Sequence, residues 1–140
     1  MTNNRHEIAF LLADLPDIHS LQAGLPEQID SHLLDPTGDV LQQMADILSA
    51  HEGLDAIHLL SRSSDGALKL GDLTLTSDNM DEHSPVLQQI GASLNEAGDL
   101  MLYGCDLAQS ETGMTFIVRL ARITGARLWH FSAPQAVAAS

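Results

Sequence analysis

The sequence predicts an α/β domain with a mostly parallel central sheet, flanking helices and a small β-hairpin. Two patterns lead to this fold class. Short apolar runs bounded by turn residues alternate along the chain with amphipathic segments whose apolar side chains recur at helical spacing. The connections between these segments are short, as in a sheet built from strand–helix–strand units. The chain of 140 residues is 44% hydrophobic, which is enough for one domain with a buried core.

Five short runs are predicted as strands of the central sheet, because they are mainly apolar and end at turn residues. These runs are Ile8–Ala13, Ser31–Leu34, Ala56–Leu60, Leu100–Tyr103 and Ala126–Phe131. The segment Ala67–Leu75 instead alternates apolar and polar residues around Gly71 and Asp72. This alternation predicts a small exposed hairpin. The residues between it and the preceding strand, Ser61–Gly66, are predicted as a turn-rich loop.

Four segments are predicted as helices from the spacing of their apolar residues. They are Asp17–Gly24, Gly38–Ala50, Pro85–Ala97 and Met114–Ile123. Asp39 favours the start of the second helix, and Gly125 is placed to end the fourth. The acidic stretch Asp78–Glu82 lacks the central glycine and terminal glutamate of a calcium loop. It is therefore predicted to be a solvated helix start and not an ion site.

The composition excludes several classes of protein. Intrinsic disorder of the whole chain is excluded by the apolar content, and a disulfide scaffold by the single cysteine. No apolar run has the roughly 18–20 residues that a membrane-spanning helix needs. Six basic against 19 acidic residues give a formal net charge of −13, which repels nucleic acid and anionic membranes. Such a charge suits a soluble surface, a cation-rich setting or a basic partner. The partner considered is a protein or peptide, and the oligomeric state is left open.

Domain limits and localisation follow from the ends of the chain. Residues 1–132 are predicted to form a single domain and residues 133–140 a loose tail of small and polar residues. The N-terminal stretch is polar before the apolar run Ile8–Ala13 and lacks the features of a secretory signal. The protein is therefore expected either to stay in the cytoplasm or to be exported by a route without an N-terminal signal.

Two loops are predicted to carry the functional site. Ser61–Gly66 and Gly104–Gln109 each follow a predicted core strand. In parallel sheets, functional groups gather beyond the carboxyl ends of the strands. If the two strands are neighbours, the loops face each other across one crevice. The second loop contains the single cysteine of the chain, Cys105.

Nearly the whole chain up to about Ala126 resembles a bacterial domain family of unknown function. The matching segments are LLDPTGDVLQQMADIL (Leu33–Leu48), LDAIHLLSRSSDGALKLGD (Leu54–Asp72), GDLMLYGCDLA (Gly98–Ala108) and FIVRLARITGA (Phe116–Ala126). That family is usually found near the N-terminal end of very large secreted or surface adhesion proteins with cadherin-like or calcium-binding repeats. It in turn resembles the caspase-like, gingipain-like cysteine peptidases. The resemblance implies a caspase-like three-layer sandwich around the parallel sheet.

The resemblance places Cys105 at the nucleophile position of those peptidases. Where the family's strand usually ends in Ser-His-Gly, this chain has Ser61, Arg62 and Ser63, so that Arg62 replaces the histidine that would act as general base. A guanidinium can stabilise a thiolate by its charge. It cannot accept and return a proton, because it stays protonated in proteins. The usual Cys–His pair is therefore missing from these residues.

Our interpretation is a non-catalytic pseudo-peptidase that serves as an interaction or structural module. Its candidate binding crevice consists of Ser61, Arg62, Ser63 and Asp106, beside Cys105. The alternative is a cysteine peptidase or self-processing domain in which Cys105 uses an unconventional base. A third hypothesis is a small-ligand or ion-binding domain built on the crevice between Arg62 and Cys105. No cofactor is predicted.

The remaining ionisable residues favour structural roles. His58 lies four residues before Arg62, about 13 Å along a strand, so that it is expected to be a hydrogen-bonded or partly buried histidine and not a base for Cys105. None of the seven histidines has the close spacing of a zinc site, and no metal site is predicted. Arg119, Arg122 and Arg127 form the only basic cluster. They are expected to pair with nearby carboxylates, with a partner-binding patch as the alternative.

Overall fold

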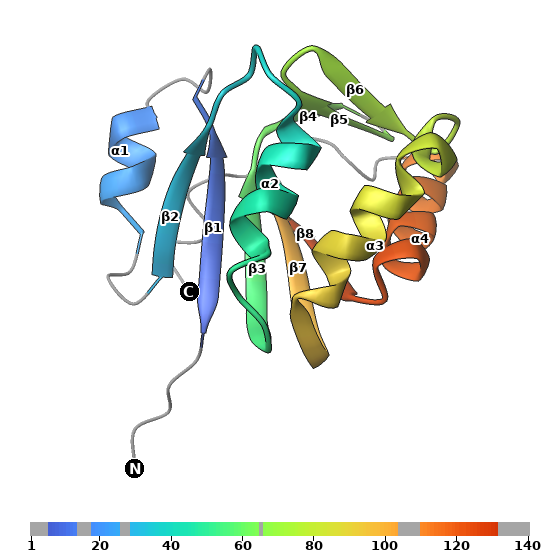
Figure 1. Cartoon of the computed structure of the whole chain (residues 1–140). Helices are drawn as coiled ribbons and strands as arrows, with labels where there is room; N and C mark the ends of the chain where they lie inside the picture. Colours follow the sequence, from blue (N-terminus) through green and yellow to red (C-terminus); the bar gives the residue numbers. More distant parts are fainter. Residues whose placement is uncertain (1–5, 14–17, 26–28, 65, 104–109, 132–140) are drawn as a thin grey trace.

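Five parallel strands form the central sheet in the order β2-β1-β3-β7-β8 (Figure 1). The computed structural model describes residues 6–13, 18–25, 29–64, 66–103 and 110–131. The strands are β1 (Glu7–Leu12), β2 (Ile29–Leu34), β3 (Leu54–Leu60), β7 (Leu94–Tyr103) and β8 (Arg127–Phe131). All five lie where the sequence predicts core strands, and the mostly parallel α/β fold is confirmed.

Helices cover the two faces of this sheet unequally. The helices are α1 (Ile18–Ala23), α2 (Val40–Leu48), α3 (Ser84–Ala92) and α4 (Glu111–Thr124), with a 3-10 turn, η1 (Met80–His83), before α3. Helices α2, α3 and α4 pack on one face. The short helix α1 lies on the other face, where Gln22 Nε2 donates to Ser31 Oγ of β2 at 3.3 Å. The sheet order reverses between β1 and β3, so right-handed crossovers place helices from the two halves on opposite faces.

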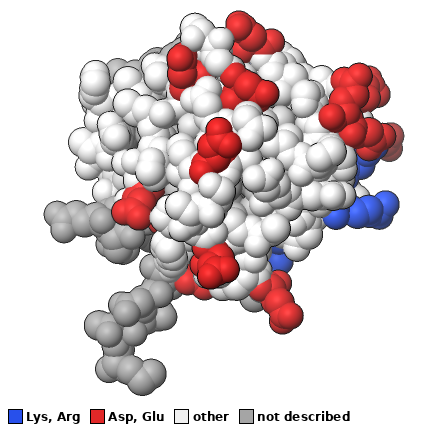
Figure 2. Space-filling view, viewed as in Figure 1, with Lys and Arg blue, Asp and Glu red and all other residues white. Residues whose placement is uncertain are grey.

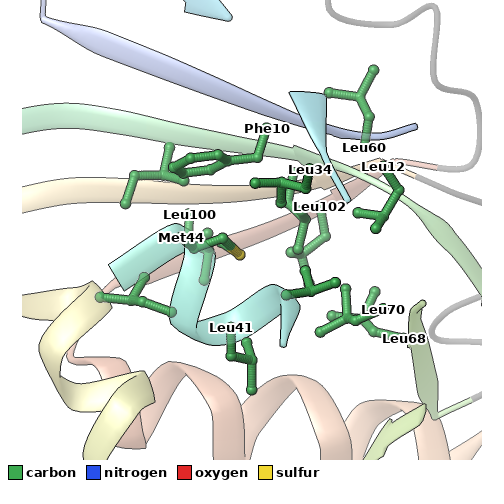
Figure 3. Close-up of a cluster of buried hydrophobic side chains, with 14 of the residues drawn as sticks. Phe10, Leu12, Leu34, Leu41, Met44, Leu60, Leu68, Leu70, Leu100 and Leu102 are labelled. Atoms are coloured by element: carbon green, nitrogen blue, oxygen red, sulfur yellow. The ribbon is translucent and has the colours of Figure 1, made fainter. Parts of the chain in front are cut away.

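The main hydrophobic core lies between the sheet and helices α2, α3 and α4 (Figure 3). Leu59 of β3 and Leu100 and Leu102 of β7 point toward these helices and meet Leu41 and Met44 of α2. Alternate strand residues face this layer because side chains in a strand point to opposite sides. The remaining strand positions therefore face the side that carries α1.

A three-stranded antiparallel sheet lies at the carboxyl end of the central sheet, over the helix layer. It consists of β4 (Arg62–Ser64), β5 (Ala67–Leu70) and β6 (Leu73–Thr76). The predicted hairpin corresponds to β5 and β6, which pair antiparallel. Its predicted exposure was wrong for one face, because Leu68, Leu70 and Leu75 are buried in the hydrophobic core. The prediction of an irregular loop over Ser61–Gly66 was wrong for its centre, because β4 pairs antiparallel with β5. Gly71 has a φ of +70° in the turn between β5 and β6, against the Pro36 carbonyl group.

The boundary between α3 and β7 differs from the prediction. Helix α3 ends at Ala92 and β7 begins at Leu94, whereas the sequence predicts a helix up to Ala97. The Leu54 N–H donates to the Ser93 carbonyl at 2.9 Å, and Leu94 pairs with Leu54 in the sheet. Pairing with β3 therefore draws these residues into a strand, although their apolar spacing is compatible with a helix.

Two predicted helix ends are confirmed. Asp39 caps α2 by accepting a hydrogen bond from the Gln42 N–H at 3.1 Å. Gly125 ends α4 in the left-handed region with a φ of 74°, and its N–H donates to the Ala121 carbonyl at 2.8 Å. Within the described ranges, no helix is both long enough and apolar enough to cross a membrane.

Candidate functional site at the carboxyl edge of the sheet

The two segments predicted to carry the site follow neighbouring strands. Strands β3 and β7 pair in parallel, with Leu60 opposite Tyr103 at their carboxyl ends. The Ser61 N–H donates to the Tyr103 carbonyl at 3.3 Å, which extends the pairing by one residue. Arg62 follows Leu60 by two positions and Cys105 follows Tyr103 by two positions. The two predicted loops were expected to share one crevice only if their strands are neighbours. Strands β3 and β7 are neighbours, so this condition is met.

The predicted site residues are only partly described. Cys105 and Asp106 lie outside the described residues. The backbone of Arg62 and Ser63 belongs to β4, where it pairs with Lys69 and Leu68 of β5, and their side chains are not described. The proposed crevice between Arg62 and Cys105 therefore stays a prediction.

Ser61 is the predicted site residue whose side chain the structure describes. It lies at the junction of β3 and β4 and is only 2% exposed. Its hydroxyl has no hydrogen-bond partner, and it is the one buried side-chain polar group of the described residues in that state. Leaving a buried hydroxyl unpaired costs about 1 to 3 kcal/mol. A polar group with unused hydrogen-bonding capacity thus lies at the carboxyl end of β3.

A buried polar network runs beneath this edge, on the sheet face opposite α2, α3 and α4. Its members are Glu7 of β1, His58 of β3 and Tyr103 of β7. The His58 Nε2 atom lies 2.8 Å from Glu7 Oε1, and the Nδ1 atom lies 2.9 Å from the Tyr103 hydroxyl. His58 and Tyr103 are each 3% exposed, and their rings stack with centroids 5.7 Å apart. The network crosses three neighbouring strands diagonally.

The hydrogen-bond directions in this network follow from the chemistry of its members. An ionised Glu7 carboxylate only accepts, so Nε2 of His58 carries the hydrogen. In the neutral ring Nδ1 can then only accept a hydrogen bond, which comes from the Tyr103 hydroxyl at 2.9 Å, and this shorter contact competes with a weak hydrogen bond from the same hydroxyl to Met101 Sδ at 3.5 Å. Burial raises the pKa of Tyr103 to about 12, with a further contribution from the negative charge of Glu7. Tyr103 is therefore a neutral hydrogen-bond donor throughout the physiological pH range.

This network bears directly on the question of a base for Cys105. Both ring nitrogens of His58 are occupied, one by Glu7 and the other by Tyr103. A general base needs a ring nitrogen within hydrogen-bond reach of the nucleophile. The expectation that His58 is a buried, hydrogen-bonded histidine is confirmed. Sequence reasoning missed Glu7 and Tyr103, because they lie 51 and 45 residues from His58 and only the strand order brings them together.

The basic cluster is mostly paired, as expected. Arg119 Nη2 lies 2.7 Å from Asp81 Oδ1, and Arg127 Nε lies 3.5 Å from Asp99 Oδ1. Arg122 is exposed on α4 and has no carboxylate partner in the described part of the chain. The Arg119–Asp81 pair is on the surface and contributes little to stability, because solvent screens it. Asp99 of the second pair is only 16% exposed and also accepts a hydrogen bond from Trp129 Nε1 at 3.0 Å.

Metal-ligating side chains do not converge in the described segments. No three histidine, aspartate, glutamate or cysteine side chains among the described residues come close enough to hold an ion. His6 instead packs against His51, with ring centroids 5.2 Å apart, and His32 packs against Phe10. These histidines thus make ring contacts at separate places in the fold.

Comparison with known protein families identifies the chain. A model of a domain of unknown function, DUF4347, matches residues 8–133. The chain belongs to the DUF4347 family. The match begins within β1 and extends just past β8, so it covers β1 from Ile8 onward, the other strands of both sheets and the helices that the structure describes. None of the curated proteins compared with the DUF4347 domain matches it.

Proposed function

We propose that this DUF4347 domain is a non-catalytic, caspase-like pseudo-peptidase that binds a protein or peptide partner at the carboxyl edge of β3 and β7. The observation that carries the proposal is the state of His58, whose two ring nitrogens are both hydrogen-bonded within the sheet. The family resemblance adds that Arg62 takes the position of the peptidases' catalytic histidine. The residues that follow the two strands thus retain a thiol and a cation but lack a free imidazole.

The chemistry of peptide hydrolysis explains why the lack of an available histidine base argues against catalysis. A cysteine thiol with a pKa near 8.5 is mostly protonated at neutral pH. A peptidase lowers this pKa with a histidine that later protonates the leaving amine. Arg62 supplies the positive charge for the first step, but it has no proton to transfer for the second. A binding role requires neither step.

The arrangement of the strands supports a binding role for the same edge. Ligands of parallel α/β sheets bind beyond the carboxyl ends of the strands, next to the point where the strand order reverses. In this chain the order reverses between β1 and β3, so β3 lies beside both the reversal point and β7. Ser61, at the end of β3, has a buried hydroxyl without a hydrogen-bond partner among the described residues. A role in secreted or surface adhesion proteins is part of the proposal through the family resemblance alone.

The reactivity of Cys105 tests the absence of catalysis. Because Cys105 is the only cysteine, alkylation by iodoacetamide over a pH range of about 4 to 10 reports on this thiol alone. We expect a titration midpoint near or above the ordinary value, and no labelling by electrophilic peptide probes beyond that of a free thiol. Rapid probe labelling together with peptide hydrolysis, both lost in Cys105→Ala, would establish the peptidase alternative instead.

A restoration variant tests the role of the Arg62 position. The double variant Arg62→His with Ser63→Gly recreates the Ser-His-Gly strand end of the related peptidases. If Arg62 is the defect, this variant reacts faster with electrophilic peptides than the wild type, whereas the control Arg62→Gln with Ser63→Gly does not. An inert double variant would show that the substrate cleft is missing as well, which favours a binding module still more strongly.

Partner binding can be separated from catalysis by a second pair of variants. Once a protein or peptide ligand has been captured, Cys105→Ala should leave its affinity unchanged. Arg62→Glu should weaken the interaction by about tenfold or more, since it reverses the charge at the proposed edge. Equal affinity for the wild type and Arg62→Glu would place the partner elsewhere on the domain.

A further inference from the structure

Helix α4 exposes apolar side chains on its outer face. Met114 is 51% exposed and Val118 is 50% exposed, while Phe116 and Leu120 on the opposite side of the helix are buried in the core. Met114 and Val118 are separated by four residues and therefore lie on the same helix face. Together with Glu111, Thr115 and Arg119, they line a shallow surface hollow. The outer face of α4 is thus apolar at its centre.

Charged residues lie at the two ends of this face. Glu111, Thr115, Val118 and Arg122 follow one another at spacings of four, three and four residues, all of them exposed. We call these four residues the α4 stripe. At a rise of about 1.5 Å per residue, its ends lie about 17 Å apart. Glu111 and Arg122 form no ion pair within the described ranges, so opposite unpaired charges flank an apolar centre.

We propose that the α4 stripe docks antiparallel against the α4 stripe of a second copy of this chain. A two-fold axis perpendicular to the helices, passing between residues 116 and 117, places Glu111 opposite Arg122 of the second copy. The same axis places Thr115 opposite Val118 of the second copy and brings Met114 beside that valine. The interface is isologous, so each contact occurs twice. The dimer therefore has two Glu111–Arg122 ion pairs, one at each end, with apolar contacts between them.

The distribution of charge over the domain favours this face over others. A chain with a net charge of −13 repels its own copies. Figure 2 shows acidic side chains spread over the viewed face, and at the edge where α4 is found in Figure 1 basic side chains lie beside a group of acidic ones. Pairing through α4 therefore brings the exposed Arg122 of each copy to the exposed Glu111 of the other. At physiological salt, charges farther apart than about 8 Å are largely screened.

The size of the contact sets the expected affinity. A pair of 14-residue helices buries less surface than the roughly 1,200 Å² of a small stable interface. We therefore expect a weak dimer, with a dissociation constant of about 10 to 500 μM. Such a dimer would form where copies are held at high local concentration, for example on one surface.

Charge reversal at the two ends of the stripe tests the antiparallel geometry. In sedimentation equilibrium at concentrations up to about 500 μM, the wild type should associate as a dimer. Glu111→Arg alone, or Arg122→Glu alone, places like charges opposite each other twice and should weaken the dimer by about tenfold. The double variant restores opposite charges at both ends and should recover most of the affinity. Lys69→Glu, an equal charge change on exposed β5, is the control for net charge and should have a smaller effect than Arg122→Glu.

A cross-linking experiment gives an independent readout that does not depend on charge. In a Cys105→Ala background, mixing Thr115→Cys with Val118→Cys should give mainly disulfide-linked pairs of the two different variants. A wild type that stays monomeric over the whole concentration range overturns the proposal. So does a double variant that associates no better than the single ones while its circular dichroism shows a folded domain, or a dimer that cross-links only between identical positions.

Discussion

The single tyrosine of the chain predicts a loss of stability at alkaline pH. Tyr103 is 3% exposed, and burial raises its pKa to about 12. In the unfolded chain this pKa returns to about 10. Between these two values the unfolded state releases a proton that the folded state retains, so raising the pH favours unfolding. The stabilisation from Tyr103 is fully present well below pH 10, and the free energy of unfolding should fall by about 2 kcal/mol from pH 10 to pH 12.

The ultraviolet absorbance of tyrosinate measures this directly, because no other tyrosine contributes. The titration midpoint should lie near 12 for the folded protein and near about 10 in concentrated urea. Urea unfolding at a series of alkaline pH values then measures the corresponding fall in stability. Glu7→Gln removes the smaller of the two causes of the raised pKa. Its midpoint should fall but stay above that of the unfolded chain, because burial is the larger cause.

Tyr103→Phe is the matched control. It removes the hydroxyl that bonds to His58 Nδ1 and should cost about 1 to 3 kcal/mol at neutral pH, because a buried polar atom loses a partner. It should also flatten the fall in stability between pH 10 and pH 12. A folded-state midpoint close to 10, or an unchanged alkaline slope in Tyr103→Phe, would refute the reasoning.

Three further predictions concern packing and helix ends, each measured by urea unfolding monitored by circular dichroism. Asp39→Ala should cost about 1 kcal/mol because it removes the cap of α2; an unchanged midpoint would contradict that role. Gly91→Ala should cost about 1 to 3 kcal/mol, since a methyl group there would collide with the backbone of Thr124 and push α3 from α4. At Gly125 an added methyl group meets open space, but the residue keeps a left-handed φ, so Gly125→Ala should cost only about 1 kcal/mol. A larger loss of stability in Gly125→Ala than in Gly91→Ala would contradict the close contact between Gly91 and Thr124. Phe116→Ala leaves a cavity at a fully buried site and should cost about 3 to 5 kcal/mol. A measured loss below about 1 kcal/mol would contradict this prediction.

The sequence predicted structure best where the deciding contacts lie within a single helix or strand. The cap at Asp39 and the left-handed end at Gly125 were both predicted, because each acts within one turn of its helix. The apolar runs of the central strands were recognised because both faces of a parallel sheet are covered. These features need no knowledge of which strand lies beside which.

Prediction failed where a neighbour in space decides the conformation. The segment after Ala92 has apolar spacing compatible with a helix, but the pairing of Leu94 with Leu54 makes it a strand. Residues 62–64 are polar and resemble a loop, but they pair with β5. In both cases hydrogen bonds to another segment outweigh a weak local preference.

The candidate site shows the same division. The presence of Arg62 after one core strand and of the single thiol after another is visible in the sequence alone. The occupancy of both nitrogens of His58 is not, because Glu7 and Tyr103 come from two other strands.

By itself, the sequence determined the fold class and the order of the central strands and of the main helices along the chain. It also shows that the single thiol follows one core strand and that Arg62 follows another. Tertiary structure alone decided the order of the strands across the sheet, the start of β7, the buried network around His58 and the exposed face of α4. The physical reason is range. Helix caps and apolar periodicity act over a few residues, whereas sheet register and burial depend on contacts between segments that are dozens of residues apart.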